Sequence, residues 1–143
     1  ITSQNTGYWA PPAIQFVLSK DYPCVRLLGV SENLDDDDVA YKAMQEALFK
    51  YPEIDFVYII AGGVNGTLQA LSEHDRHIRV CTFDDTPMAR KALVSGRILA
   101  TICQQPYEQG YQAVKAVFEK VICRRPFSSD LYTELSIKVD ESL

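Results

Sequence analysis

Two short polar segments carry side chains that could hold a small polar ligand. The first is Asp-Asp-Thr-Pro at 84–87, which directly follows an apolar, β-branched run at 78–83. The second is Gln-Gln-Pro at 104–106, which ends another apolar run at 99–103. The carboxyl ends of neighbouring parallel strands meet at one edge of an open α/β sheet, and ligands bind at that edge. We therefore predict a ligand site formed by the side chains of these two segments.

The paired carboxylates Asp84 and Asp85 could instead act as an acid–base pair or as magnesium ligands, as in phosphoryl transfer. Such chemistry needs a nucleophile, a suitably placed lysine or a phosphate-binding loop, and the sequence supplies none of them. The glycine pair Gly62-Gly63 matches neither G-x-G-x-x-G nor the P-loop pattern. It makes either a tight strand-to-helix turn or a close backbone approach to a ligand, which keeps Gly63 among the candidate ligand contacts. We expect no enzymatic activity and no cofactor.

Strands and helices alternate along the chain, and these elements must position the polar segments. Apolar runs predict strands at 1–3, 24–30, 54–61, 78–83, 97–103 and 131–139. Helical spacing of apolar residues predicts helices at 13–20, 37–50, 64–74, 86–94 and 106–123. The expected core face of the second helix consists of Val39, Ala43, Ala47 and Leu48. This alternation predicts an α/β fold in three αβα layers, with a mainly parallel, doubly wound sheet.

Aromatic and acidic residues beside two predicted helices each have a structural and a functional interpretation. Tyr8 and Trp9 precede the helix at 13–20, where such a ring either stacks on a sugar ring or covers the core. Four aspartates at 35–38 suggest a metal site, but they lack the spaced ligands and the glycine of a calcium loop. Because they directly precede a helix, capping of its first N–H groups is the better-supported interpretation. We predict no bound metal.

Length, charge and cysteine content exclude several classes of protein. The chain has 143 residues, enough for one domain with a core, and a formal net charge of −5. An acidic chain without a basic patch is not expected to bind nucleic acid by itself, and no apolar run is long enough for a membrane span. The four cysteines show no C-x-x-C spacing, so we expect buried free thiols, as in a cytosolic protein. The start at Ile1 fits a domain cut from a longer polypeptide or a mature secreted protein.

Four sequence segments between 54 and 111 together resemble a known family. They are Leu-Gln-Ala-Leu at 68–71, Val-Cys-Thr-Phe-Asp-Asp-Thr-Pro at 80–87, the segment from Gly96 to Tyr107, and Gly110-Tyr111. In these segments the chain resembles the carboxy-terminal lobe of the type I periplasmic-binding-protein superfamily. Within that superfamily it is most similar to the effector domains of the lac-repressor family of transcription regulators. With residues 1–20 included, the resemblance covers essentially the whole chain.

The resemblance implies a cleft in which two lobes close over a sugar or another small polar molecule, such as a polyol. It implies that the Asp84 carboxylate accepts hydrogen bonds from ligand hydroxyl groups and that the Gln104 amide binds them from the next strand. A carboxylate accepts from two neighbouring hydroxyls, and an amide both donates and accepts, so the chemistry agrees. Asp85 would assist them.

The chain departs from the family pattern at two places. It has Gly63-Val64 where the family often has Asn-Asp, and it has the stretch at 8–12 where the family usually carries an arginine. An ordinary sugar contact is lost at each place. Tyr8, Trp9 and the bare backbone at Gly63 would then shape a different pocket.

The resemblance also implies a division of the chain into three parts. Residues 1–105 would form the carboxy-terminal lobe, 106–126 a crossover helix that packs on an amino-terminal lobe, and 127–143 a returning strand and tail. No amino-terminal lobe belongs to this sequence, so the apolar stripe of the crossover helix would lack its usual partner. We predict that the stripe packs on a second copy of the chain or folds back on its own sheet.

The function expected from the resemblance is effector sensing in a cytoplasmic transcription regulator of the lac-repressor family. A small-molecule effector would change a homodimer formed through the helix at 64–74, and that change would alter the affinity for DNA. DNA would be contacted only through an amino-terminal helix-turn-helix outside this sequence. The alternative is a solute-binding protein of a sugar ABC transporter, which would share the fold and the ligand contacts.

Overall fold

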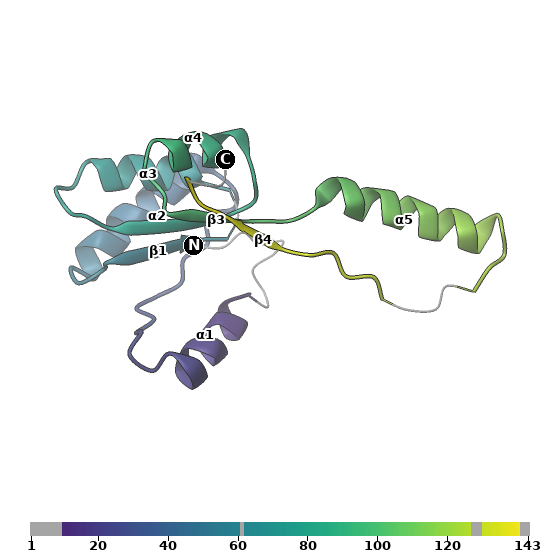
Figure 1. Cartoon of the computed structure of the whole chain (residues 1–143). Coiled ribbons are helices and arrows are strands. Elements are labelled where there is room, and N and C mark those ends of the chain that lie inside the picture. The colour runs from purple at the N-terminus through teal and green to yellow at the C-terminus, as the bar shows by residue number, and fades with distance from the viewer. Residues whose placement is uncertain (1–9, 61, 127–129, 141–143) are drawn as a thin grey trace.

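One four-stranded sheet organises the chain, which we describe from a computed structural model at residues 10–60, 62–126 and 130–140. The strand order is β1-β2-β3-β4, and helices lie on both sides of the sheet (Figure 1). The helices are α1 (Ala10–Asp21), α2 (Asp37–Lys50), α3 (Val64–Ser72), α4 (Pro87–Val94) and α5 (Pro106–Val121). The strands are β1 (Phe56–Ile59), β2 (Arg79–Phe83), β3 (Ala100–Cys103) and β4 (Ser136–Lys138).

The sheet is mainly parallel, as the alternation of elements predicts. β1 pairs in parallel with β2, and β2 with β3, so that Ile59 lies opposite Thr82 and Thr82 opposite Thr101. β4 returns antiparallel to β3, with Ser136 opposite Cys103. The predicted α/β class and the mainly parallel open sheet are confirmed.

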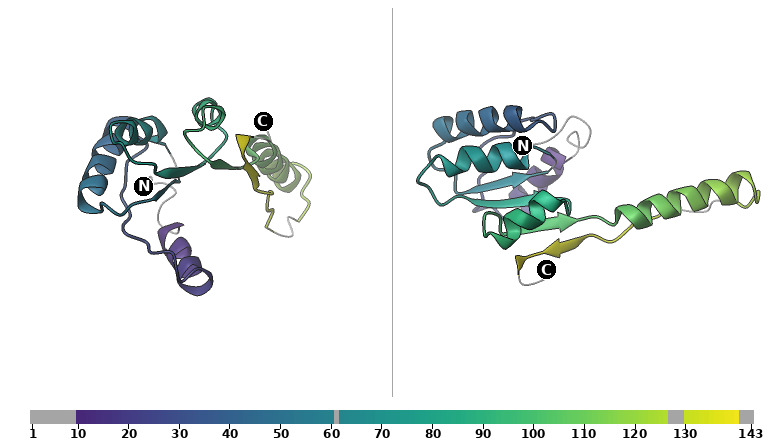
Figure 2. Two further views of the ribbon diagram at one scale, coloured as in Figure 1. Left: turned by 60° about the vertical axis from the view of Figure 1, so that its left-hand side comes forward. Right: turned by 90° about the horizontal axis from the view of Figure 1, so that it is seen from above.

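The core lies between one face of this sheet and helices α2, α3 and α4 (Figures 1 and 2). Alternate residues of a strand face opposite sides of a sheet, so only one set of strand side chains enters this core. Its buried apolar members include Met44, Val57, Ile59, Val80 and Leu93. α1 lies on the opposite side of the sheet, away from that core (Figure 2).

Helix α2 begins and ends where the sequence predicts, but its predicted core face is only partly right: Leu48 belongs to the core and Ala47 packs against it. Ala40, Met44 and Leu48 are buried, whereas Val39 is exposed. The capping interpretation of the acidic run is confirmed at Asp36, whose side chain accepts a hydrogen bond from the Val39 backbone N–H at 2.9 Å. Ala40 and Met44 take the places in the core that were expected for Val39 and Ala43.

The backbones of helices α2 and α3 are in direct contact near the amino termini of the two helices. The Asp37 carboxylate accepts a hydrogen bond from the Gly66 backbone N–H at 3.2 Å. A Cβ atom on Gly66 would collide with the Asp37 carbonyl oxygen and lie 2.9 Å from the Tyr41 nitrogen. Glycine is therefore the residue that lets these two helices pack so closely.

The predicted strand at 24–30 is wrong in the structure, because no residue of this run joins the described sheet. Val25 and Val30 are exposed, and Leu28 alone of this run packs against the core. An apolar run becomes a strand only where a neighbouring strand satisfies its backbone hydrogen-bonding groups. The run at 24–30 does not pair with β1, which is left as the edge strand of the described sheet. The other predicted strand of this region, at 1–3, lies outside the described residues.

The expectation of four buried thiols is also only partly right. Cys24 and Cys123 are exposed, Cys81 is half-buried and Cys103 is buried, and all four are free. Burial raises the pKa of the Cys81 and Cys103 thiols above the ordinary value. These two cysteines are therefore protonated and pack as small apolar groups.

Helix α5 and the segment that returns from it extend away from the sheet as an arm (Figures 1 and 2). Within the described part of the chain, none of the α5 residues is buried. The helix therefore does not fold back on its own sheet, which removes one of the two predicted arrangements, and packing on a second copy stays a prediction. The final strand forms as predicted but is limited to β4. No helix among the described residues is both long and apolar enough to cross a membrane.

Candidate ligand-binding site

The predicted polar segments meet at one edge of the sheet, which we call the rim. β1, β2 and β3 run in parallel and in close register, so the residues that follow them emerge on the same side. Gly62 and Gly63 follow β1, Asp84 and Asp85 follow β2, and Gln104 follows β3. The rim is therefore the place where the fold gathers hydrogen-bonding groups from three strands.

Asp84 is held at the rim in a backbone conformation that is unusual for any residue except glycine. Its φ angle is 76°, in the left-handed region. Two hydrogen bonds keep it there: the Asp84 N–H donates to the Ile102 carbonyl at 2.7 Å, and the Thr101 hydroxyl donates to the Asp84 carbonyl at 2.8 Å. Non-glycine residues held in this region cluster at ligand-binding and active sites, because their surroundings must compensate for the strain.

The side chains of Asp84 and Gln104 meet, as the position of their strands predicts. Gln104 Nε2 donates to Asp84 Oδ1 at 2.8 Å, and both side chains are half-buried. Among the described residues, no hydrogen bond to Asp84 Oδ2 is formed, so this oxygen can accept from a ligand. The pair thus presents an anionic acceptor next to an amide, a combination that suits a molecule with neighbouring hydroxyl groups.

Asp85, the third predicted ligand residue, is occupied within the chain. Arg90 donates to both carboxylate oxygens, from Nε and Nη2 at 2.6 Å each, and Lys138 Nζ donates to Oδ2 at 2.6 Å. The hydrogen bonds from Arg90, followed by those from Lys138, hold the pKa of Asp85 well below its ordinary value. In this structure Asp85 therefore ties β4 to α4, and both of its carboxylate oxygens accept hydrogen bonds within the chain.

Gly63 is the N-cap residue of α3 and is buried in a tight turn. Its φ angle is 77°, and an added Cβ atom would lie 2.6 Å from Ala40 Cβ. The buried Asn33 side chain holds the turn by donating from Nδ2 to the Gly62 carbonyl at 2.7 Å, while the Gly62 N–H donates to Asp35 Oδ1 at 2.8 Å. These contacts favour the turn interpretation of the glycine pair over a direct ligand contact. Tyr8 and Trp9 lie outside the described residues.

Two residues that the sequence analysis did not single out extend the Asp84–Gln104 pair into a longer network. Gln109, in the first turns of α5, donates from Nε2 to Gln104 Oε1 at 3.3 Å and to the Thr133 hydroxyl at 3.0 Å. Thr133 belongs to the segment that returns towards β4. The spacing of Gln109 from Gln104 was visible in the sequence, but the approach of Thr133 from a distant segment was not.

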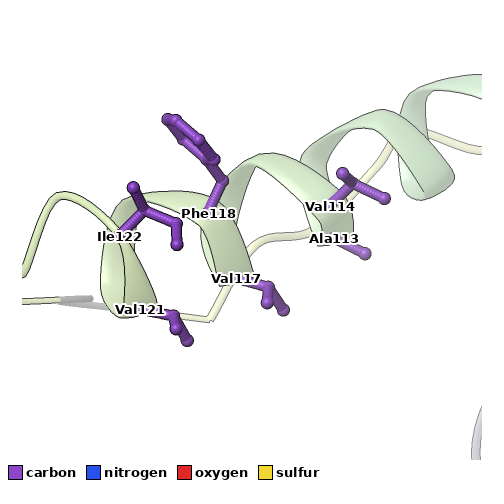
Figure 3. Close-up of a pocket in the computed structure, with 6 residues that line it drawn as sticks. All are labelled: Ala113, Val114, Val117, Phe118, Val121 and Ile122. Atoms are coloured by element: carbon purple, nitrogen blue, oxygen red, sulfur yellow. The ribbon is translucent and has the colours of Figure 1, made fainter.

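An apolar groove on α5 is a poorer candidate for the ligand site than the rim. It is lined by Ala113, Val114, Val117, Phe118, Val121 and Ile122 (Figure 3). None of these side chains can orient a hydroxyl group, and the groove lies on the arm, towards the carboxyl end of α5. Among the described residues, no group of three or more His, Cys, Asp or Glu side chains could hold a metal ion either.

Comparison with known proteins gives a family and a set of structural relatives. The family model of the periplasmic binding protein domain matches residues 2–122. No curated protein sequence matches the chain significantly.

Several solved structures share the fold at low sequence identity. A carbohydrate transporter solute-binding protein from Agrobacterium radiobacter, in complex with D-arabinose, superimposes with a TM-score of 0.81 at 19% identity, over 92% of this chain and 45% of its own. An ABC transporter solute-binding protein from Agrobacterium vitis, bound with α-D-tagatopyranose, gives 0.79 at 20% identity, over 91% and 44%. GanP, a glucose-galactose binding protein from Geobacillus stearothermophilus, gives 0.78 at 22% identity, over 86% and 45%. The chain thus spans less than half the length of each of these proteins.

Proposed function

The chain belongs to the periplasmic binding protein domain family, and from this premise we propose that it forms one lobe of a carbohydrate-binding protein. The observation that carries the proposal is the Asp84–Gln104 pair at the rim, joined at 2.8 Å and presenting an open carboxylate oxygen. A sugar hydroxyl would donate to Asp84 Oδ2, and the second Gln104 N–H would donate to a neighbouring hydroxyl oxygen. The family is one of binding-protein domains, which supports binding without catalysis.

The opposite wall of the binding cleft would come from a second lobe. The similar solute-binding proteins are about twice as long as the stretch that matches this chain. We infer that the second lobe also covers the apolar stripe of α5, where Val114 and Val117 are 71% and 63% exposed. Large apolar side chains exposed in such a row indicate an interaction surface.

A solute-binding protein of a sugar transporter is the function that the comparisons favour. The structural relatives from both Agrobacterium species are transporter solute-binding proteins, and each was solved with a sugar. Such a protein would work outside the cytoplasmic membrane. We therefore place it ahead of the regulator that the sequence resemblance suggests.

A lac-repressor-family regulator is the second candidate, because all four cysteines are free. Unpaired thiols are usual in the reducing cytoplasm, where a regulator would act as a homodimer on DNA. The residues encoded before Ile1 distinguish the two candidates. A signal peptide would support the transporter function, and a helix-turn-helix would support the regulator.

Calorimetric titration of the complete polypeptide that carries these residues tests the ligand site. The probes are D-arabinose, D-tagatose, D-glucose and D-galactose. For the sugar that binds the wild type, we expect Asp84→Asn and Gln104→Ala each to raise Kd about 10-fold to 100-fold, the effect of losing a charged or a well-placed hydrogen bond. Asn keeps the left-handed backbone accessible at position 84.

Two exposed residues of the same types serve as controls. Asp75→Asn and Gln69→Ala change a carboxylate and an amide that lie away from the rim, and both should leave Kd unchanged. Unaltered binding in both Asp84→Asn and Gln104→Ala would show that the sugar binds elsewhere. Absence of binding by the wild type to all four sugars would contradict a carbohydrate ligand of this kind.

A further inference from the structure

We propose that Gln109 is a positioning residue, which fixes the orientation of the Gln104 amide and ties the rim to the arm. The proposal rests on the proposed function, since it concerns the ligand-binding pair of that site. It assigns a role to a residue that need not touch the ligand itself.

A carboxylate can only accept hydrogen bonds, so Asp84 Oδ1 must face an N–H of Gln104. That contact turns Gln104 Oε1 away from Asp84, towards α5. Gln109 must then present a donor to this oxygen, and its Nε2 does so at 3.3 Å. Asp84 thus selects one of the two orientations that the Gln104 amide can adopt, and the donor from Gln109 holds the amide in that orientation.

Gln109 is also hydrogen-bonded to the returning segment. An amide nitrogen carries two hydrogens, and Gln109 Nε2 uses one for Gln104 and the other for the Thr133 hydroxyl at 3.0 Å. Both residues line the groove between α5 and the segment that leads to β4. Gln109 is therefore the donor in both of its hydrogen bonds, to Gln104 and to Thr133, and Gln104 in turn donates to Asp84.

This network joins the two segments by which the chain leaves the sheet and comes back to it. Gln104 follows β3 on the way out, and Thr133 precedes β4 on the way back. A ligand that binds Asp84 and Gln104 therefore acts on groups whose orientation depends on how these segments lie together. Gln109 makes ligand affinity depend on the placement of the arm.

The first test is free of any ligand and uses the side-chain amide resonances of Gln104 in a ¹⁵N-labelled sample. Gln109→Leu removes the donor, and we expect the Gln104 N–H signals to shift and to exchange faster with solvent. The matched control is Gln112→Leu, because Gln112 lies on the same helix but donates to Glu108, at 2.6 Å. Equal, wild-type-like Gln104 signals in both variants would overturn the proposal.

The second test measures binding of D-arabinose and the other three sugars to the complete polypeptide. We expect Gln109→Leu to raise Kd about threefold to tenfold, as for loss of one neutral hydrogen bond, and Gln112→Leu to leave it unchanged. If the wild type binds none of the sugars, the proposed function fails, and the amide resonances still decide the role of Gln109.

A charged variant gives a signature that a purely structural role would not produce. In Gln109→Glu the carboxylate cannot donate at neutral pH, so it competes with Asp84 for the N–H2 group of Gln104. Protonation near the ordinary glutamate pKa of about 4.3 restores a donor. The ratio of the variant Kd to the wild-type Kd should therefore fall as the pH is lowered from 7 to 4. If this ratio for Gln109→Glu changes with pH no more than the ratio for Gln112→Glu, Gln109 does not act as the hydrogen-bond donor to Gln104.

Discussion

Gly66 and Gly110 both lie inside helices, yet their surroundings differ completely. A Cβ atom on Gly66 in α3 would strike the carbonyl of Asp37 in α2, whereas a Cβ atom on Gly110 in α5 would meet nothing within 4 Å. The first helix belongs to the body, which we define as the sheet with α2, α3 and α4; the second belongs to the arm. In the body, the backbones of neighbouring helices are in direct contact at Gly66, whereas nothing packs against the arm at Gly110.

The same contrast holds for the apolar side chains of the two regions. Met44 and Leu93 in the body are each 1% exposed, while Phe118 on the arm is 54% exposed. Most of the stability of a helix in a protein comes from packing of its apolar face against other elements. The apolar stripe of α5 therefore contributes little stability within the described part of this chain. Such a stripe predicts that a helix face is buried, but it does not identify the element that buries it.

The strongest test of this comparison is the same substitution at the two glycines. Gly66→Ala should destabilise the body by about 4 kcal/mol, because one helix must move away from the other. Gly110→Ala should change stability by less than about 1 kcal/mol and in the favourable direction, since alanine is the better helix former. Urea unfolding followed by circular dichroism measures both, and similar effects at the two sites would remove the distinction between body and arm.

A pair of leucines sharpens the comparison at the level of side-chain packing. Leu93 is 1% exposed in the core, and Leu135 is 61% exposed on the returning segment. Leu93→Ala should cost about 3 kcal/mol through lost burial and the cavity left behind, whereas Leu135→Ala should cost less than about 0.5 kcal/mol. The same urea titration provides the values. A cost at Leu135 close to that at Leu93 would show that the arm is packed in solution.

The smallest effect on stability is expected at Asp85, which is hydrogen-bonded to Lys138 in β4, the strand that follows the arm. Its hydrogen bonds to Arg90 and Lys138 lower its folded pKa below the unfolded value of about 3.9. The stabilisation is thus present above that pH and is lost as the pH falls through the folded pKa. Asp85→Asn should cost about 1 kcal/mol at pH 7, a modest value because Arg90 is largely exposed.

Unfolding measured from pH 7 down to pH 2 checks this expectation. The stability difference between wild type and Asp85→Asn should shrink as the pH falls below 4. Asp75→Asn, at an exposed carboxylate, is the matched control and should show no such convergence. Parallel curves for wild type and Asp85→Asn would mean that the ion pairs with Arg90 and Lys138 do not contribute.

The order of elements in the body could be predicted because each has a strong local signal. Thr86 and Pro87 start α4 by capping and by proline in the first turn, and Asp36 caps α2. The meeting of Asp84 and Gln104 followed from the rule that parallel strands end at one edge. The buried face of α2 followed only in part, because Leu48 was predicted but Ala40 and Met44 were not.

Other features could not be predicted because they depend on pairing between distant segments. The run at 24–30 has strand-like composition, but composition alone does not supply a neighbouring strand. The roles of Asp85 and Gln109 depend on Lys138 and Thr133, and both partners come from the returning segment. Local pattern identified the carboxylates and amides, and only the fold distinguished the open Asp84 from the occupied Asp85.

The antiparallel pairing of β3 with β4 makes everything between them one long hairpin loop, closed where Cys103 lies opposite Ser136. The entropy lost in closing a loop grows only logarithmically, and each doubling of its length adds about 0.6 kcal/mol. The sheet can therefore tolerate large changes in the length of residues 104–135 without a change in strand order. In evolutionary terms, the β3–β4 hairpin is an insertion point, at which α5 could be exchanged for another module while the body stays intact.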